Sequence, residues 1–315
     1  MRLTMTLRNV AILGLFLLMP AALVHANEDG VIAAWVQYTV DGVEARVVST
    51  GDCPRVRIDG RTVEMWERAQ PTYAHPNTVC AAEIPAGTRS IRVSGKRLPA
   101  PTRKRPRRIV VMGDTGCRLS ASHGLYQECN NNSLWPFARV ARSVAAAAPD
   151  AIIYTGDYIY REDECPEGDN GCKGSPSGDN QKTWEADWLV PAAPVHASAP
   201  LVLIRGNHET CKRSGTGWFR YLDARPLPAE CEDSTDPWVV DLGAVQVGVM
   251  DVANTKDQNG EPLDWLFAQQ LDELDRVLTK RSWIATHRPF WGFGADDDTG
   301  ELTQPTEVLQ DAVRE

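Results

Sequence analysis

The chain has 315 residues, of which 43% are hydrophobic, and its formal net charge is -9. Such an acidic chain is poorly suited to nucleic-acid binding, because phosphate contacts need clustered lysine and arginine. The one basic run, at residues 103–108, contains a proline and precedes an apolar segment, so we interpret it as a solvated linker. We therefore expect no nucleic-acid partner.

Residues 1–26 predict a secretory signal peptide. Arg2 and Arg8 precede an apolar stretch at residues 10–24, and Ala26 supplies a small residue just before a polar start. The apolar stretch is short for a membrane span, and an uncleaved N-terminal anchor is the alternative. We expect a secreted or periplasmic protein that has no membrane attachment after cleavage.

Residues 27–100 predict a small all-β domain. Short segments of alternating hydrophobicity are separated by Asp-Gly and Ala-Gly turns, which is typical of antiparallel strands in a sandwich. These segments are residues 33–40, 43–48, 56–58 and 89–93. A proline-containing linker follows at residues 98–102, so a second domain is expected at residues 101–315.

From residue 108 onward the pattern changes to strand, loop and helix, which predicts an α/β fold. Apolar runs predict buried strands at Ile109–Met112, 151–155, 201–204 and 283–285, and another strand at 245–250. The alanine-rich segment 136–148 predicts a helix between the first two strands, and the three elements would form a right-handed βαβ unit. Pro262 is expected to open a second long helix.

The eight cysteines all lie after the predicted signal peptide. An even number in an exported protein favours disulfides over a thiol nucleophile. A thiolate zinc site is the alternative, but the chain has no Cys-x-x-Cys pair. The sequence does not fix the connectivity. Pairing of neighbours in the chain would give Cys53–Cys80, Cys117–Cys129, Cys165–Cys172 and Cys211–Cys231.

Four sequence blocks each directly follow one of the predicted strands. They are GDTG at residues 113–116, GDYIY at 156–160, GNHE at 206–209 and THRP at 286–289. Because ligands bind outside the carboxyl ends of strands in open α/β sheets, we expect these loops to converge on one edge. Their side chains offer oxygen and nitrogen atoms suited to transition metals. Any single block is also typical of a turn or a helix cap.

Together and in this order, the four blocks resemble the motifs of the calcineurin-like metallophosphoesterases, and more narrowly those of the purple acid phosphatases. The resemblance covers about residues 108–292. It implies a layered β-sheet sandwich flanked by helices, and a metal-dependent enzyme that hydrolyses phosphate esters of small molecules. The nucleophile would be a hydroxide bound to a dinuclear metal centre.

The resemblance also implies which residues hold the two metal ions. Asp114 and Tyr160 would bind the first ion, Asp157 would bridge both, and Asn207 and His287 would bind the second. A phenolate favours a hard trivalent ion such as Fe(III), while imidazole and amide oxygen suit a divalent ion. The expected pair is therefore iron with iron, zinc or manganese.

A catalytic role for His208 is the further implication of the resemblance. Its ring would face the phosphate and donate a proton to the leaving oxygen, and Glu209 would orient it. The alternative is a purely structural histidine. Asp251, at the end of the strand at residues 245–250, is expected to form a turn rather than to support a metal ligand.

One motif of the family, GHxH, does not occur, and His287 is the last histidine in the sequence. In the family that motif supplies one histidine to each metal. We therefore expect that the chain lacks part of its catalytic domain, binds metal poorly and turns over little. The alternative is a degenerate phosphoesterase-like domain that binds phosphate or a partner. The substrate and the oligomeric state stay open.

Overall fold

The structure is a computed structural model. It describes residues 30–102, 105–243, 245–254, 263–279, 281–292, 294–295, 299, 302–303 and 307–314. The expected signal peptide lies outside these residues. Within them, no helix combines the length and the apolar character needed to cross a bilayer.

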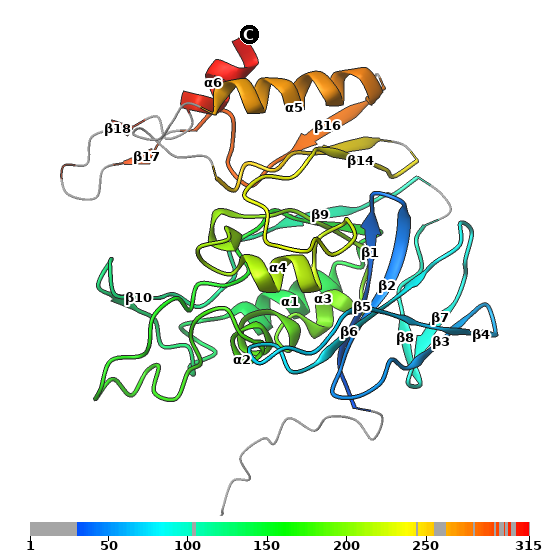
Figure 1. The fold of residues 1–315 in the computed structure, drawn as a ribbon, viewed down its shortest axis with the longest axis horizontal. Coiled ribbons are helices and arrows are strands. Elements are labelled where there is room, and N and C mark those ends of the chain that lie inside the picture. The colour runs from blue at the N-terminus through cyan, green and yellow to red at the C-terminus, as the bar shows by residue number, and fades with distance from the viewer. Residues whose placement is uncertain are drawn as a thin grey trace, which may run out of the picture.

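A seven-stranded sheet runs through the centre of the molecule (Figure 1), in the order β5-β6-β2-β1-β13-β12-β9. Its strands are β1 (Val31–Thr39), β2 (Gly42–Ser49), β5 (Trp66–Ala69), β6 (Thr78–Glu83), β9 (Ile109–Met112), β12 (Ala151–Tyr154) and β13 (Leu201–Leu203). The N-terminal strands pair antiparallel, whereas β1, β13, β12 and β9 pair parallel. One sheet therefore crosses the expected domain boundary near residue 100, and the division into two domains stays a prediction.

All described elements before residue 100 are strands, as the sequence predicts. A second sheet of four strands packs on the N-terminal half of the large sheet. It contains β3 (Arg55–Ile58), β4 (Arg61–Glu64), β7 (Ile91–Val93) and β8 (Lys96–Leu98). Val47 of the large sheet and Val56 and Ile91 of the small one share a buried core. This face-to-face arrangement is a β-sandwich.

A three-stranded sheet packs on the other half of the large sheet. Its strands are β14 (Trp238–Asp241), β15 (Gln246–Val249) and β16 (Ser282–Ala285). Ile153 and Val202 of the large sheet share a core with Val240 and Val247 of the small one. The predicted layered sandwich is therefore confirmed.

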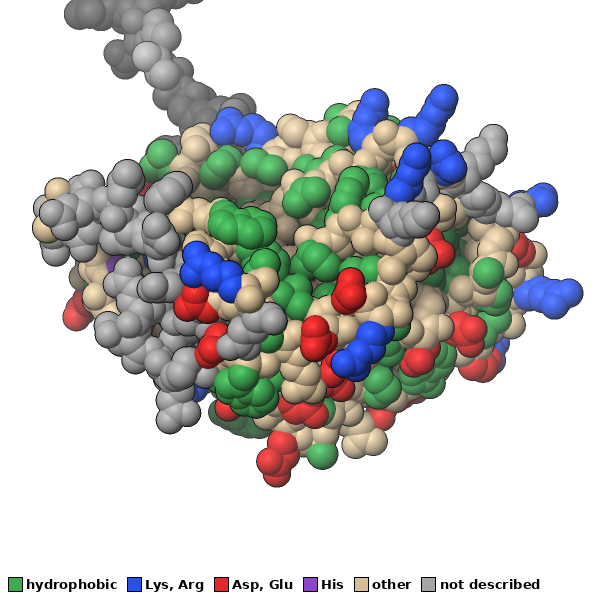
Figure 2. Space-filling view, turned by 90° about the horizontal axis from the view of Figure 1, so that it is seen from above, with side chains coloured by type: hydrophobic (Ala, Val, Ile, Leu, Met, Phe, Trp, Pro, Cys, Tyr) green, Lys and Arg blue, Asp and Glu red, His purple; other side chains and the backbone are tan. Residues whose placement is uncertain are grey.

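Two helices, α5 (Asp264–Val277) and α6 (Glu307–Arg314), cover the outer face of the three-stranded sheet. Strand β16 was expected to be buried, but Trp283 is 48% exposed and Ile284 is 40% exposed. Among the described strands β16 pairs only with β15, so it forms an edge. Seen from the side of α5 and α6, hydrophobic side chains gather in a hollow of this face (Figure 2).

The opposite face of the large sheet is covered by short helices. They are α1 (Phe137–Ala146), α2 (Gln181–Trp184), a π-helix at Glu185–Leu189, α3 (Ala193–His196) and α4 (Gly215–Tyr221). The helix expected at residues 136–148 corresponds to α1, which lies between β9 and β12 and completes the predicted βαβ unit. The described residues also include short strands β10 (Leu119–Ser120), β11 (Leu125–Tyr126), β17 (Gly294–Ala295) and β18 (Leu302–Thr303).

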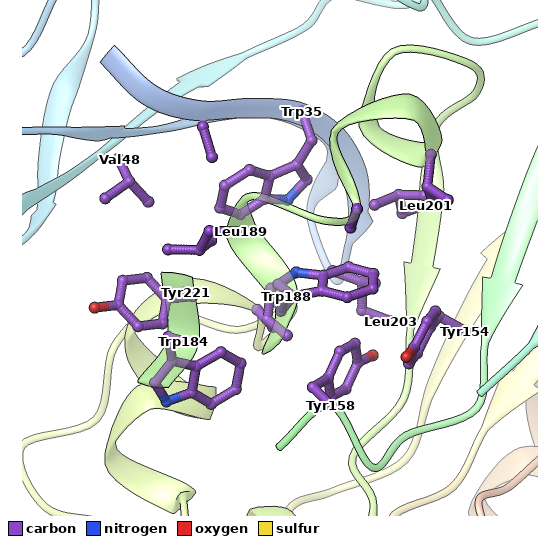
Figure 3. Close-up of a cluster of buried hydrophobic side chains, with 14 of the residues drawn as sticks. Trp35, Val48, Tyr154, Tyr158, Trp184, Trp188, Leu189, Leu201, Leu203 and Tyr221 are labelled. Atoms are coloured by element: carbon purple, nitrogen blue, oxygen red, sulfur yellow. The ribbon is translucent and has the colours of Figure 1, made fainter. Parts of the chain in front are cut away.

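An aromatic core lies beneath the motif loops (Figure 3). The ring of Tyr158 stacks on Tyr154 with centroids 4.4 Å apart and meets Trp188 edge-on at 4.8 Å. Its hydroxyl donates to Ile204 O at 3.1 Å. Since Tyr158 follows Asp157, this buried ring fixes the loop that carries the second motif.

All eight cysteines are paired, and each disulfide joins neighbours in the chain. The four pairs are Cys53–Cys80, Cys117–Cys129, Cys165–Cys172 and Cys211–Cys231. The expected connectivity is confirmed. Two of the bridges, Cys117–Cys129 and Cys165–Cys172, share a small core with Leu119, close to the loop that follows β9.

Candidate metal centre

Three of the four motif loops leave neighbouring parallel strands. Asp114 follows β9, Asp157 follows β12, and Asn207 begins the short 3-10 helix at Asn207–Glu209 that follows β13. The last residues of these strands pair directly with one another, so the strands end at the same level. This register brings the three side chains to one edge of the large sheet.

The fourth loop comes from a different sheet. His287 follows β16 of the three-stranded sheet, and its Nδ1 atom donates to Thr155 O at 2.8 Å. That hydrogen bond turns Nε2 toward the other motif loops. The expectation that all four loops share one sheet edge is therefore wrong for His287, which reaches the site across the interface between two sheets.

The backbone of the first two loops adopts an uncommon conformation. Asp114 and Asp157 have φ angles of 56° and 58°, in the left-handed region. Aspartate is among the few residues other than glycine that are enriched there, and such backbone strain clusters at functional sites. Gly206 also packs against Asp157, and a Cβ atom at position 206 would overlap the backbone nitrogen and Oδ1 of Asp157. The second and third loops therefore fit together only with glycine at this point.

The five residues expected as metal ligands lie together around the Asp157 carboxylate. On one side, the Tyr160 hydroxyl is 2.6 Å from Asp157 Oδ2 and 3.0 Å from Asp114 Oδ1. On the other side, His287 Nε2 is 3.4 Å from Asp157 Oδ2 and 2.9 Å from Asn207 Oδ1. Asp114, Asp157 and His287 each offer one ligand atom, and these three atoms lie within 4.8 Å of one another. Their role as ligands stays a prediction.

The electrostatics of this cluster favour a bound cation. Burial acts to raise the pKa of Asp157, but the hydrogen bond and positive charge of His287 outweigh it and lower that pKa well below its usual range. Burial acts to lower the pKa of His287, but the hydrogen bond and negative charge of Asp157 outweigh it and raise that pKa above its usual value. Burial and the two carboxylates raise the pKa of Tyr160. A buried carboxylate that depends on a neighbouring positive charge, beside a phenol and an imidazole, fits a metal ion.

Glu209 holds the second and third loops together. Its buried carboxylate accepts backbone N–H groups from Gly206, Asp157, Tyr158 and Ile159 at 2.8–3.3 Å. Burial, followed by the negative charge of Asp157, raises the pKa of Glu209 to about 8. This role differs from the expected one, since the carboxylate binds the loop backbone rather than the ring of His208.

Another acid, Glu162, contacts His208 instead. His208 Nδ1 lies 2.9 Å from Glu162 Oε1, while Nε2 lies 3.8 Å from Asp157 Oδ2. The ring also packs on Tyr160, with centroids 4.0 Å apart. Glu162 was missed in the sequence, although it follows the GDYIY block by only two residues. That closeness to Tyr160 was the available signal.

A family model described as calcineurin-like phosphoesterase matches residues 107–308, which is more than half of the chain. The chain belongs to the calcineurin-like phosphoesterase family. Two solved structures also resemble this chain, and both comparisons cover 90% of it with a TM-score of 0.51. One is purple acid phosphatase PPD1 from yellow lupin (Lupinus luteus) seeds, at 15% identity. The other is described as PhoD, at 11% identity.

At these identities the two structures establish a shared fold only. The chain spans 56% of the length of the lupin protein and 66% of the length of PhoD. No curated protein sequence matches it.

A buried ion pair joins the large sheet and the three-stranded sheet beside the site. Arg205, which follows β13, lies 3.2 Å from Asp251, which follows β15. Arg205 also donates to Glu209 O at 2.9 Å. Asp251 accepts the N–H of Ala253 at 3.0 Å, as expected of a turn former, but its second oxygen binds Arg205 and Thr235. Asp251 therefore supports the loop that carries Asn207.

A cavity of about 520 Å³ opens beside His208. Its walls include Ser122 from the turn between β10 and β11. Further polar and charged side chains come from the segments just after the second and third motifs: Glu162, Asp163, Lys212, Arg213 and Ser214. A cavity of this size can hold a small organic group. It lies on the side of His208 where Glu162 Oε1 is 2.9 Å from the ring atom Nδ1.

Proposed function

We propose that the chain hydrolyses phosphate esters of small molecules at a centre of two metal ions. Asp114 and Tyr160 would hold one ion, Asn207 and His287 the other, and Asp157 would bridge them. The observation that carries this proposal is the position of Asp157 Oδ2, which lies 2.6 Å from the Tyr160 hydroxyl and 3.4 Å from His287 Nε2. One carboxylate thus faces both halves of the donor set.

Two bound cations would lower the pKa of a shared water molecule and neutralise charge on the phosphoryl group. The residues of the protein hold the groups of the site in position. Asp157 and Glu209 keep the second and third loops at a fixed separation, and the hydrogen bond to Thr155 O keeps the Nε2 atom of His287 directed inward. His208 Nε2 faces Asp157 and would give a proton to the leaving oxygen.

The donor types favour iron at one position. A phenolate such as that of Tyr160 stabilises Fe(III), whereas the imidazole and amide oxygen of His287 and Asn207 suit a divalent ion. We therefore propose iron paired with iron, zinc or manganese. Because ligands must lose their protons, metal uptake would release the proton that Tyr160 holds between the two carboxylates.

The test compares Asp157→Asn with the unchanged chain in metal content and in hydrolysis of p-nitrophenyl phosphate. Loss of the bridging charge should weaken metal binding by at least about 100-fold, since changes behind the ligands already cost about 10–100-fold. Asp236→Asn, at an exposed position, is the matched control. A charge-transfer band in the visible range would report Tyr160 on Fe(III). Equal metal content and equal rates for Asp157→Asn and the unchanged chain would contradict the proposal.

A binding module without turnover is the second candidate. Among the described residues, the Asp114–Asp157–His287 cluster contains one histidine, which favours weak metal binding. Phosphate binding that persists in the unchanged chain, without hydrolysis of any ester at any metal supplement, would favour this candidate over the enzyme.

We also propose that the protein acts in a secreted or periplasmic compartment. Disulfides persist in oxidising compartments, and all eight cysteines of this chain are paired. Detection of free thiols in the protein isolated from its native source would contradict this assignment.

A further inference from the structure

A buried aspartate outside the four motifs binds the backbone of two motif loops. Asp187 is fully buried and lies in the π-helix at Glu185–Leu189. Its Oδ2 atom accepts the backbone N–H of Cys117 at 3.2 Å and that of Tyr160 at 3.3 Å. Cys117 directly follows the first motif, and Tyr160 ends the second. One carboxylate oxygen therefore joins the two loops that carry the proposed ligands of the first metal ion.

The other oxygen of Asp187 fixes the direction of the carboxylate. The buried side chain of Arg161 donates from Nε to Asp187 Oδ1. The Arg161 guanidinium lies 5.2 Å from the centre of the Trp135 ring, and Trp135 Nε1 donates to Thr115 O at 2.8 Å. These contacts return to the first motif, so Asp187 and Trp135 both bind the backbone of residues 115–117.

The π-helix holds Asp187 in this place. π-helices are rare and occur mostly as single turns, often at functional sites. Here the N–H of Val190 donates to Glu185 O at 3.1 Å, five residues back. The next residue after Asp187, Trp188, meets the ring of Tyr158 edge-on (Figure 3). The turn therefore packs against the second motif loop, which leaves Asp187 little freedom to turn away.

We infer that Asp187 is a positioning residue for Asp114 and Tyr160. This inference rests on the proposed function, because those two side chains would hold the first metal ion. The Tyr160 hydroxyl lies 3.0 Å from Asp114 Oδ1, although the two residues come from different loops. Buried N–H groups need acceptors, so without Asp187 the backbone at Cys117 and Tyr160 would move to find others. That movement would separate the two ligands.

A purely structural role for Asp187 makes a different prediction. Backbone hydrogen bonds also join the two loops, from Asp114 N–H to Gly156 O and from Leu119 N–H to Tyr160 O, both at 3.0 Å. If these bonds alone set the loops, loss of Asp187 would lower the free energy of unfolding, and the folded protein would bind metal as before. If Asp187 positions the ligands, the folded variant binds the first ion more weakly and the second ion much less so.

The experiment compares Asp187→Asn with the unchanged chain in iron affinity and in the visible band of Tyr160 on Fe(III). The amide of asparagine has one acceptor oxygen, so it cannot serve both Arg161 and the loop N–H groups. We expect iron binding to weaken by about 10–100-fold and the band to shift or disappear. Asp223→Asn is the matched control, because Asp223 is also buried and pairs with Arg225 at 3.0 Å, outside the motif loops. An equal band and equal affinity in all three proteins would overturn the inference.

A second measurement does not depend on metal. Hydrogen exchange of the backbone amides of Cys117 and Tyr160 is followed by NMR in the metal-free proteins. We expect faster exchange at both amides in Asp187→Asn than in Asp223→Asn, and equal exchange in these two variants would overturn the inference. If the unchanged chain binds no metal but the exchange changes as expected, the proposed function fails while the fixing of the two loops by Asp187 stands.

A second variant covers the case in which Asp187→Asn does not fold. Arg161→Lys keeps the buried charge pair but removes the planar guanidinium that directs Asp187 Oδ1. The iron band and the exchange at Cys117 and Tyr160 should change in the same direction, by a smaller amount. An unchanged band together with unchanged exchange in Arg161→Lys would then overturn the inference.

Discussion

Arg205 and Asp251 form a buried ion pair, 3.2 Å apart, between strand ends in two different sheets. Arg205 follows β13, whose loop carries Asn207, and Asp251 follows β15, the neighbour of the strand that leads to His287. The pair therefore fixes the two sheets relative to each other where Asn207 and His287 meet. A site built from two sheets needs such a link, because no strand pairing joins the two sheets in the described part of the chain.

Asp251→Asn should destabilise the fold strongly. The change leaves the Arg205 charge buried without its partner, which costs about 3–5 kcal/mol in the free energy of unfolding. Denaturant unfolding of the variant and the unchanged chain measures this difference. Asp236→Asn, at an exposed position, should change the free energy by less than about 0.5 kcal/mol. A loss of similar size for both variants would contradict the assigned role of the pair.

Gly206→Ala should damage the metal centre more than the fold. The added Cβ atom would overlap the backbone nitrogen and Oδ1 of Asp157, so the carboxylate must move away from Tyr160 and His287. We expect a loss of bound metal, measured by mass spectrometry of the purified protein after dialysis. Gly51→Ala is the control, since a Cβ atom there meets nothing within 4 Å. Normal metal content in Gly206→Ala would show that the two loops can separate without consequence.

His196 should make the protein less stable at acid pH. Burial lowers the pKa of His196 to about 3, between the rings of Trp35 and Trp188. Because the unfolded chain takes up a proton near pH 6.5 and the folded chain does not, stability is lost as the pH falls from 6.5 toward 3. Between pH 6.5 and pH 5 this loss is about 2 kcal/mol in the free energy of unfolding.

His196→Phe keeps a ring in this place and removes the titrating group. The variant should therefore lose less stability than the unchanged chain when urea unfolding is measured at pH 6.5 and at pH 5. His123→Gln, at an exposed position, should follow the unchanged chain. An acid-side loss that is the same in all three proteins would mean that His196 is not its source.

Trp283→Lys should reduce self-association of this chain. Trp283 lies on the edge strand β16, and Trp265, which is 59% exposed, lines a groove of about 730 Å³ between α5, α6 and β16. Exposed apolar edge strands favour pairing with a second copy, and lysine on such an edge opposes it. Sedimentation velocity at rising concentration measures the effect. Tyr73→Lys, which changes an exposed aromatic residue away from this edge, should leave association unchanged.

The ends of the parallel strands in the large sheet could be predicted because a local residue pattern marks each of them. A short apolar run followed by glycine and aspartate indicates a buried strand and a turn. Strand β12 confirms this pattern, whereas β9 lies at the end of the described strand order and its Val111 is 60% exposed. Helix α1 lies close to the expected residues. The disulfide pairing could also be proposed from the sequence, because pairing of cysteines that are neighbours in the chain closes the shortest loops. The side chains of Asp114, Asp157 and Tyr160 lie together for the same local reasons.

Contacts between segments far apart in the chain could not be predicted from the sequence. Nothing near His287 indicates that it reaches Thr155 from another sheet, because that contact depends on how two sheets pack. Glu209 and Glu162 are both acids close to motif histidines or tyrosines in the sequence. Only the folded loops decide that Glu209 binds backbone N–H groups and that Glu162 faces the ring of His208.

The path of β1 has a consequence for any attempt to divide the protein. Its residue Gln37 pairs with Leu201 of β13 on one side, while β2 pairs along its other side. If the chain is cut near residue 100 and the fragments separate, β1 and β13 lose their mutual hydrogen bonds. Each fragment then exposes an unpaired strand edge to water. Co-expressed halves should therefore reassemble with each other or precipitate, rather than persist as two independent soluble pieces.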